Sequence, residues 1–198
     1  AILRPAFLAS TVATERAAQL ASLQEDNDDV VTWGAKKLRS SFFGEHPFAI
    51  GPHGDEADVK AMKARDLEVL YRKLMRGGNL VLAVSGDFDP RVLGKKCRAL
   101  LSKIPKGKPS SDREGFSGGA QSGVLIEKQP KQQAIVFEAY EGPSIRDDDF
   151  YVGEVMDELF SGMSSRLFER VREELGLAYF VRSTRVIGMD AAMFYFYA

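Results

Sequence analysis

The order of hydrophobic patterns over residues 123–197 constrains the fold of this chain more than any other feature. Two stretches with a strand pattern, about Gly123–Glu127 and Gln133–Tyr140, come first, and two helical stretches follow them. Two more strand stretches, about Tyr179–Ile187 and Ala191–Tyr197, close the chain. The strands come in pairs and do not alternate one by one with helices. The pattern therefore predicts an α+β fold with a largely antiparallel sheet.

The two helical stretches between the strand pairs have recognisable ends. The first follows the acidic run Asp147–Asp149, which suits a helix start, and it ends at Gly162. The second starts near Ser164 or Ser165 and ends at Gly176. The predicted inner face of the first helix consists of apolar residues at helical spacing: Val152, Val155, Met156, Leu159 and Phe160.

The first half of the chain predicts mostly helices. One helix has Asn27 or Asp28 as its N-cap, and another starts at Asp89-Pro90, where a capping Asp precedes a Pro. Between them, Leu80–Ser85 is a short apolar run with turn residues on both sides, which predicts a buried strand. Cys97 lies on the apolar face of the second of these helices, so we interpret it as a small core residue.

A change of composition marks the best linker in the sequence. Pro105–Ser122 is rich in Gly, Ser, Pro, Lys and Asp. We therefore predict a first domain at 1–106, a linker at 107–120 and a second domain at 121–198. The chain begins without an initiator Met or a signal-peptide pattern and stops inside a predicted strand. We expect a piece of a longer protein, and the cellular location stays open.

The composition argues against several classes of protein. The chain has 27 Lys and Arg against 28 Asp and Glu, a net charge of −1, so it has no overall basic character for binding nucleic acid. No apolar run approaches the roughly 18 residues that a membrane-spanning helix needs. The single cysteine excludes an intrachain disulfide. We predict no nucleic-acid partner and no membrane span.

The histidines do not form a familiar metal site. A zinc hydrolase needs two His or Cys ligands at helix or turn spacing, together with a carboxylate. The only histidines, His46 and His53, lie in a stretch rich in Gly and Pro, and neither His-Glu-x-x-His nor His-x-x-Glu-His occurs. A metal site made from these two loop histidines and a distant acid is the weaker alternative. A Cys–His nucleophile is also poorly supported, because no His lies near Cys97.

Two stretches of sequence carry more information. The first runs from His46-Pro47-Phe48 to Gly78-Asn79-Leu80-Val81-Leu82-Ala83-Val84-Ser85-Gly86-Asp87. The second is Gly162-Met163-Ser164-Ser165-Arg166-Leu167-Phe168, followed by Val171-Arg172-Glu173-Glu174-Leu175-Gly176-Leu177-Ala178-Tyr179. In this order they resemble the inverzincin zinc peptidases, peptidase family M16, which include pitrilysin, insulinase and the mitochondrial processing peptidase. The chain looks like the zinc-free type of subunit that keeps an arginine and a tyrosine.

The resemblance implies the fold and the position of the zinc. It implies an α+β fold with a mainly antiparallel sheet and helices on one face, in two similar domains of the processing-peptidase-like metallohydrolase type, both truncated. In active members the third zinc ligand is a Glu that follows another Glu by seven residues on one helix. Here Glu15 matches the earlier position and Ser22 the ligand position, and the nearby Glu25 would need a gap. We therefore expect no metal on this chain and zinc on the partner half.

The resemblance also implies that Arg172 and Tyr179 are catalytic. Arg172 falls in the last turn of a predicted helix, Gly176 permits a reversal, and Tyr179 opens the next strand, so both can reach one point. They would donate hydrogen bonds to the substrate backbone or the oxyanion, while zinc and a general-base Glu act from the partner half. Without the flanking motif, a surface Arg and a half-buried strand Tyr would be the simpler interpretation. Arg166 is a weaker candidate with a structural role at a helix start.

Three functions remain open. In the main hypothesis the chain is part of a zinc-dependent peptidase for unfolded peptides, is inactive alone, and forms a dimer with a zinc-bearing partner subunit or pairs with the other half of its own chain. The alternative is a non-catalytic scaffold or core subunit of the same family. The third is an unrelated α+β binding module, which requires the motif match to be accidental. A neighbouring chain that carries His-x-x-Glu-His would favour the first hypothesis, the zinc-dependent peptidase.

Overall fold

The computed structural model describes residues 3–109 and 121–198, and these residues pack into two compact units. Unit 1 contains the described residues of 1–21 and 56–114, and unit 2 contains those of 22–55 and 115–198. Most of the predicted linker 107–120 lies outside the described residues. The predicted domain ranges 1–106 and 121–198 stay a prediction, since the packing units divide the chain in a different way from the sequence.

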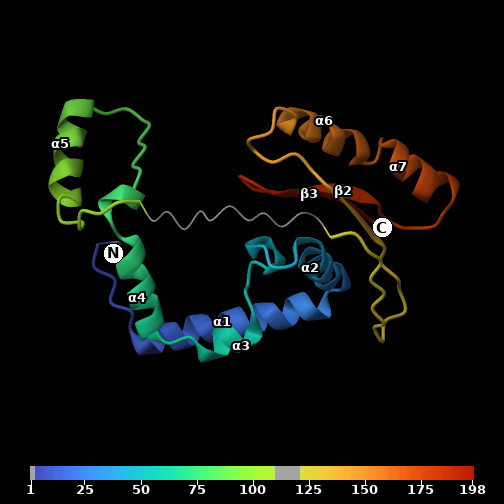
Figure 1. The fold of residues 1–198 in the computed structure, drawn as a ribbon, viewed down its shortest axis with the longest axis horizontal. Coiled ribbons are helices and arrows are strands. Elements are labelled where there is room, and N and C mark those ends of the chain that lie inside the picture. The colour runs from blue at the N-terminus through green and yellow to red at the C-terminus, as the bar shows by residue number, and fades with distance from the viewer. Residues whose placement is uncertain (1–2, 110–120) are drawn as a thin grey trace. The chain divides into compact units, whose positions relative to one another are not determined.

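Unit 1 is built from helices. α1 (Ala9–Asp28) begins in this unit and continues into unit 2, and α3 (Glu56–Ala61), α4 (Ala64–Leu74), η2 (Gly77–Asn79) and α5 (Pro90–Leu101) follow (Figure 1). The carboxylate of Asp89 accepts hydrogen bonds from the backbone N–H groups of Arg91 and Val92, at 2.7 and 3.2 Å. This confirms the predicted helix start, where the side chain satisfies two N–H groups that lack partners inside the helix.

The prediction of a buried strand at Leu80–Ser85 is wrong. These residues form no strand, and Val81 is 96% exposed. A strand is stable only when a neighbour pairs with its backbone N–H and C=O groups. No strand occurs among the described residues of unit 1, so the apolar run has no sheet to join.

Unit 2 contains a three-stranded sheet. β1 (Phe137–Glu141), β2 (Arg182–Ile187) and β3 (Ala192–Tyr197) form an antiparallel sheet in the order β1-β3-β2. The last two strands confirm the predicted closing pair, and β1 confirms the end of the predicted stretch Gln133–Tyr140. The predicted strand at Gly123–Glu127 is wrong, because these residues are exposed and pair with no strand in the described chain.

Helices pack on both faces of this sheet. Unit 2 contains α2 (Val30–Phe43), η1 (Pro47–Ala49), α6 (Phe150–Phe160), α7 (Arg166–Phe168) and η3 (Glu169–Glu174), the last with π-helical hydrogen bonding. α2 lies on one face and α6 on the other (Figure 1). The prediction that helices cover one face is therefore wrong for this sheet, although the α+β class and the antiparallel pairing are confirmed.

The N-cap of α2 lies one residue after Asp28, the nearer of its two predicted caps. Asp29 is the N-cap, and its carboxylate accepts a hydrogen bond from the Thr32 N–H at 2.7 Å. Hydrogen bonds from the side chain and the backbone N–H of Thr32 lower the pKa of the Asp29 carboxyl. The predicted caps Asn27 and Asp28 instead lie in the last turn of α1. Among the described helices, none combines the length and the apolarity that crossing a bilayer requires.

The core of unit 2 lies between α2 and the sheet. Met193 on β3 is fully buried and packs with Phe42 and Phe43 at the end of α2. The two phenylalanine rings meet edge to face, with centroids 5.0 Å apart. Phe48 of η1 adds a third ring 5.5 Å from Phe43. Because Met193 has contacts on every side, its removal leaves a cavity.

We predict that Met193→Ala lowers the free energy of unfolding of unit 2 by about 2–5 kcal/mol, the usual cost of emptying a buried methionine site. The measurement is urea denaturation followed by the fluorescence of Trp33, the only tryptophan, which lies on α2. Met189→Ala is the matched control, because Met189 is exposed in the turn between β2 and β3. Equal stability losses in the two variants would contradict the assignment of Met193 to the core.

Candidate functional site

The structure brings the two predicted catalytic residues together. The guanidinium carbon of Arg172 lies 4.7 Å from the centre of the Tyr179 ring. It also lies 4.8 Å from the centre of the Phe168 ring, an aromatic partner that the sequence analysis missed. A cation at this distance from a ring face is attracted by the ring quadrupole. Phe168 could have been found from its position four residues before Arg172, which is a neighbouring position on a helix.

The local backbone explains how the two side chains meet. Arg172 lies in η3, and the carbonyl oxygens of Val171 and Arg172 accept hydrogen bonds from the N–H groups of Leu177 and Gly176, at 3.0 and 3.1 Å. Gly176 has a φ of +59°, a conformation that glycine adopts without steric cost. The chain therefore reverses directly after the helix and returns Tyr179 beside Arg172.

The pair faces solvent. Tyr179 is 81% exposed, and the Arg172 side chain is partly exposed. Within the described chain, the charged partner of Arg172 is Glu173, whose carboxylate lies 3.5 Å from Nε. A guanidinium and a phenol that reach solvent can donate hydrogen bonds to a peptide carbonyl or a carboxylate. The catalytic role of both residues stays a prediction.

Arg166 occupies the helix start that the sequence predicts. α7 begins at this residue, and the hydroxyl of Ser165 caps it by accepting a hydrogen bond from the Phe168 N–H at 3.1 Å. The Arg166 side chain is exposed. Ser165, which the sequence analysis named with Ser164 as a possible start, is thus the capping residue.

The two histidines have separate environments within unit 2. His46 caps η1, and its Nδ1 accepts a hydrogen bond from the Phe48 N–H at 3.1 Å. His53 Nδ1 lies 2.6 Å from a carboxylate oxygen of Asp26. Across residues 3–109 and 121–198, no group of three or more His, Cys, Asp or Glu side chains is arranged to hold a metal ion.

Glu15 and Ser22, the two positions that bear on the zinc ligand, lie two turns apart on α1. Glu15 is exposed at the edge of a hollow of about 420 Å³ in unit 1, which Phe7, Val12 and Leu67 also line. Ser22, at the position that the resemblance assigns to the third zinc ligand, is half-buried and has no carboxylate. The expectation that zinc belongs to a partner half stays a prediction.

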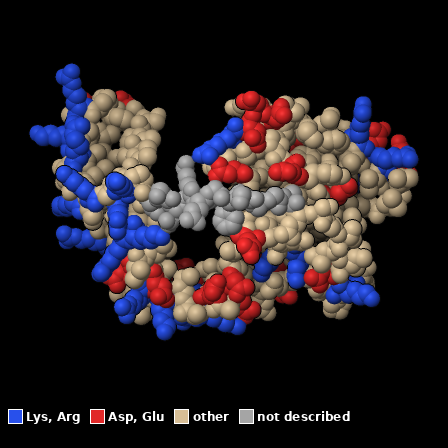
Figure 2. All heavy atoms as spheres, viewed as in Figure 1, with Lys and Arg blue, Asp and Glu red and all other residues tan. Residues whose placement is uncertain are grey.

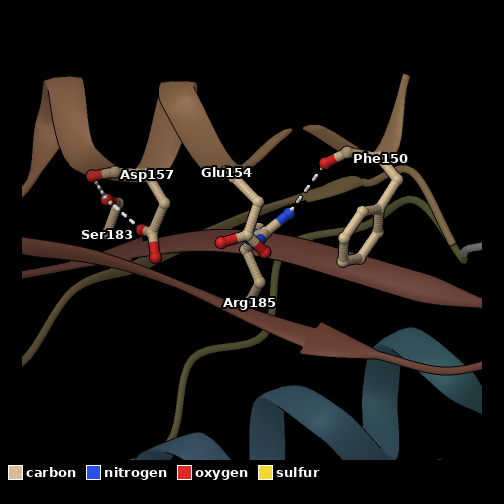
Figure 3. Close-up of polar contacts among 5 residues, drawn as sticks. All are labelled: Phe150, Glu154, Asp157, Ser183 and Arg185. Carbon is tan, nitrogen blue, oxygen red and sulfur yellow. Dashed lines mark hydrogen bonds and ion pairs between the residues drawn. The ribbon is translucent and has the colours of Figure 1, made fainter. Parts of the chain in front are cut away.

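A polar network that the sequence analysis missed holds α6 against β2 (Figure 3). The hydroxyl of Ser183, a buried residue of β2, donates to the Asp157 carboxylate at 2.6 Å and lies 3.1 Å from the Asp157 carbonyl oxygen. The hydroxyl of Ser161, at the end of α6, lies 2.9 Å from the Ser183 hydroxyl. Buried hydroxyl and carbonyl groups need such partners.

Arg185 forms the second half of this network, one helical turn away. Its side chain is only 6% exposed, and its guanidinium pairs with the half-exposed carboxylate of Glu154 and approaches the Phe150 carbonyl oxygen at 3.5 Å (Figure 3). Its Nε has no hydrogen-bond partner among the described residues. Burial lowers the pKa of the Arg185 guanidinium, because desolvation disfavours the charged form. Gly153 permits this approach, since a Cβ there would lie 2.7 Å from the guanidinium.

The network corrects the predicted orientation of α6. Gly153, Glu154 and Asp157 face the sheet, whereas Val155 of the predicted inner face is 68% exposed. β2 presents Ser183 and Arg185 to the helix, and only a polar helix face satisfies their hydrogen-bonding groups. The sequence signal for this contact was the spacing of the polar residues. Glu154 and Asp157 are three residues apart on α6, and Ser183 and Arg185 are two apart on β2, so each pair lies on one face of its element.

Comparisons with known proteins point to one family. The sequence profile described as "Peptidase M16 inactive domain" matches residues 61–198. A Rickettsia felis (strain ATCC VR-1525 / URRWXCal2) protein named an uncharacterized zinc protease is 29% identical over 182 residues, which cover 91% of this chain and 43% of the relative. A Bacillus subtilis (strain 168) protein named a probable inactive metalloprotease is 24% identical over 180 residues, which cover 90% of this chain and 42% of the relative.

A solved structure shows the same fold. The crystal structure of the peptidase M16 inactive domain from Pseudomonas fluorescens matches with a TM-score of 0.77 at 20% sequence identity. The match covers 98% of this chain and 48% of that one. The chain therefore spans less than half the length of the relatives and of the solved structure that it matches.

We predict that Glu154→Gln destabilises unit 2 more than Arg185→Met does. The glutamine leaves a buried guanidinium without a charged partner, which costs about 1–3 kcal/mol. The methionine fills the space of the arginine stem and leaves only a carboxylate that reaches water, so we expect a loss within about 1 kcal/mol. The measurement is urea denaturation followed by Trp33 fluorescence. Glu158→Gln on the exposed side of α6 is the control, and a larger loss for Arg185→Met would overturn this ranking.

Proposed function

The chain belongs to the peptidase M16 inactive domain family, and on this premise we propose that it is a non-catalytic domain of an M16-type protein. The single observation that carries the proposal is the match of residues 61–198, 138 of the 198 residues, to the inactive-domain profile. The name of the Bacillus subtilis relative, a probable inactive metalloprotease, agrees with it. The predicted resemblance to this family is thereby confirmed.

In this proposal the chain contributes structure and surface and does not bind zinc. The donor set of residues 3–109 and 121–198 supports this, because it includes no group of three or more His, Cys, Asp or Glu side chains arranged to hold a metal ion. At the position that the resemblance assigns to the third zinc ligand, Ser22 offers a hydroxyl, and a hydroxyl is a poor zinc ligand. Residues 1–106 would be the later part of one family domain and residues 121–198 most of a second, paired with another half or subunit.

A second candidate function is support for catalysis from the non-metal side. The contact between Arg172 and Tyr179, at 4.7 Å and open to solvent, favours it. In a complex with a zinc-bearing half, the two side chains would donate hydrogen bonds to a peptide carbonyl as negative charge develops on its oxygen. A purely structural role does not require a tyrosine that is 81% exposed.

We predict that the purified chain binds no stoichiometric zinc and hydrolyses no peptide. The test is elemental analysis after dialysis against about micromolar zinc, a level at which structural zinc sites are saturated, together with an assay on a library of unfolded peptides. A His46→Ala/His53→Ala double variant is the control, because it removes the loop histidines as weak ligands. One tightly held zinc per chain, or hydrolysis that copurifies with the chain, would refute the non-catalytic proposal.

The second candidate makes a separate prediction. In a complex with a zinc-bearing partner, Arg172→Ala and Tyr179→Phe should each lower peptide turnover by about 10²-fold or more if the groups stabilise the oxyanion. The double variant should lose less than the product of the two losses, because both donors serve one oxygen. Arg166→Ala is the matched control on α7. Normal turnover in both single variants, with complex formation intact, would leave only the non-catalytic role.

A further inference from the structure

The near-neutral chain consists of two units with opposite charge. The described residues of unit 1 hold 15 Lys and Arg against 7 Asp and Glu, a net charge of +8. Those of unit 2 hold 11 Lys and Arg against 19 Asp and Glu, a net charge of −8. The overall charge of −1 conceals this separation. Charge segregated on this scale steers association with other molecules.

The positive excess of unit 1 comes from one stretch of the chain. Residues 72–108 hold ten Lys and Arg and only two acidic residues, Asp87 and Asp89, so their net charge is +8. This equals the net charge of the whole unit, and the other described residues of unit 1 are therefore neutral in sum. All ten basic side chains are exposed. Figure 2 shows Lys and Arg gathered over the region of α4 and α5. We call these ten residues the basic face: Arg72, Lys73, Arg76, Arg91, Lys95, Lys96, Arg98, Lys103, Lys106 and Lys108.

The backbone holds several of these cations close together. The N–H groups of Gly77 and Gly78 donate to the carbonyl oxygens of Pro105 and Gly107, at 3.0 and 3.1 Å. These bonds place the end of α4 beside residues 105–108. Arg76 packs so closely on Gly107 that a Cβ on this glycine would lie 2.8 Å from its side chain. The end of α4 and the segment after α5 thus contribute to one surface.

Three cations of α5 lie on the side of the helix opposite two of its apolar residues. Arg91, Lys95 and Arg98 follow one another at i, i+4 and i+7, so they share one face of the helix. Leu93 and Cys97 project from the opposite side. Eight members of the basic face, all except Arg72 and Lys73, form no ion pair with any residue that the structure describes.

Unit 2 presents complementary groups on α6 and in the two residues that precede it. Asp148, Asp149 and Glu158 are exposed, and no described side chain forms an ion pair with them. Exposed apolar residues lie between them, including Tyr151 and Val155. The basic face has exposed apolar neighbours of its own: Val92, Leu100 and Leu101. The two surfaces are therefore opposite in charge, and each leaves apolar side chains uncovered.

We infer that the basic face of unit 1 docks on the acidic α6 side of unit 2 in a second copy of the chain. The inference rests on charge complementarity and is independent of the proposed non-catalytic role. A polyanion such as an acidic membrane or a nucleic acid would attract unit 1 and repel unit 2 of the same chain. A second copy satisfies both units at once, because each offers the charge that the other lacks.

The first test is the salt dependence of self-association, measured by sedimentation velocity on the 198-residue chain. At about 0.01 M salt the Debye length is about 30 Å, and at about 1 M it is about 3 Å. We expect the weight-average mass to rise at least twofold with protein concentration at low salt and to return to the monomer value at high salt. A chain that stays monomeric at low salt and high protein concentration overturns the inference.

The decisive test is a charge exchange between two variants. Lys95→Glu/Arg98→Glu reverses the stripe on α5, and Asp148→Lys/Asp149→Lys/Glu158→Lys reverses the acidic side of α6. Each variant alone should self-associate at least tenfold more weakly, and an equimolar mixture should associate again as a complex of the two. Lys63→Glu/Arg65→Glu is the control, because it changes the charge of unit 1 equally from outside the basic face and should leave association unchanged.

Three outcomes overturn the inference. A mixture of folded variants, checked by circular dichroism, that fails to associate shows that the two surfaces do not meet. A change in sedimentation that depends on salt but not on protein concentration shows pairing within one chain. Binding to phosphatidylserine vesicles that tracks the basic face, in a chain that does not self-associate, assigns this face to an acidic membrane.

Discussion

The hydrogen bonds between Ser183 of β2 and Asp157 of α6 determine which face of α6 lies on the sheet. A buried hydroxyl that loses its partner costs about 1–3 kcal/mol, and the adjacent Arg185 guanidinium needs a carboxylate for the same reason. The face of α6 that carries Glu154 and Asp157 supplies both partners. α7 and η3 follow α6 directly, so the orientation of this helix also sets where the chain reaches Arg172.

This arrangement leaves aliphatic side chains of α6 in solvent. Each such side chain contributes up to about 1.5–3 kcal/mol when a partner buries it fully. These side chains are Val152, Val155, Met156 and Leu159. A partner surface that covers them recovers this free energy while leaving the polar network in place. The acidic residues on the same helix favour a partner that is basic as well as apolar, such as the basic face of unit 1 in a second copy.

The contact between Arg172 and Tyr179 follows from local backbone geometry. The sequence predicts its components, which are Arg172 in the last turn of a helix, a reversal at Gly176 and a strand that Tyr179 opens. In the structure this strand begins three residues later, at Arg182 of β2. The structure adds π-helical bonding in η3 and the ring of Phe168, which holds the guanidinium from a second direction. Local hydrogen bonding determines this site, which explains why a motif of fewer than twenty residues is sufficient to predict it.

The features of this chain that depend on short-range forces could be predicted from its sequence. Four features arise between residues that are near in the chain. They are the Asp89 cap, the antiparallel pair of β2 and β3, the glycine reversal at Gly176 and the contact between Arg172 and Tyr179. Contacts between residues far apart in the chain set which face of α6 is buried, and they place α2 on the opposite face of the sheet from α6. Periodicity reports which residues are apolar, but the orientation of a helix depends on what lies opposite. At α6 the opposing residues were Ser183 and Arg185, whose buried polar groups required polar partners.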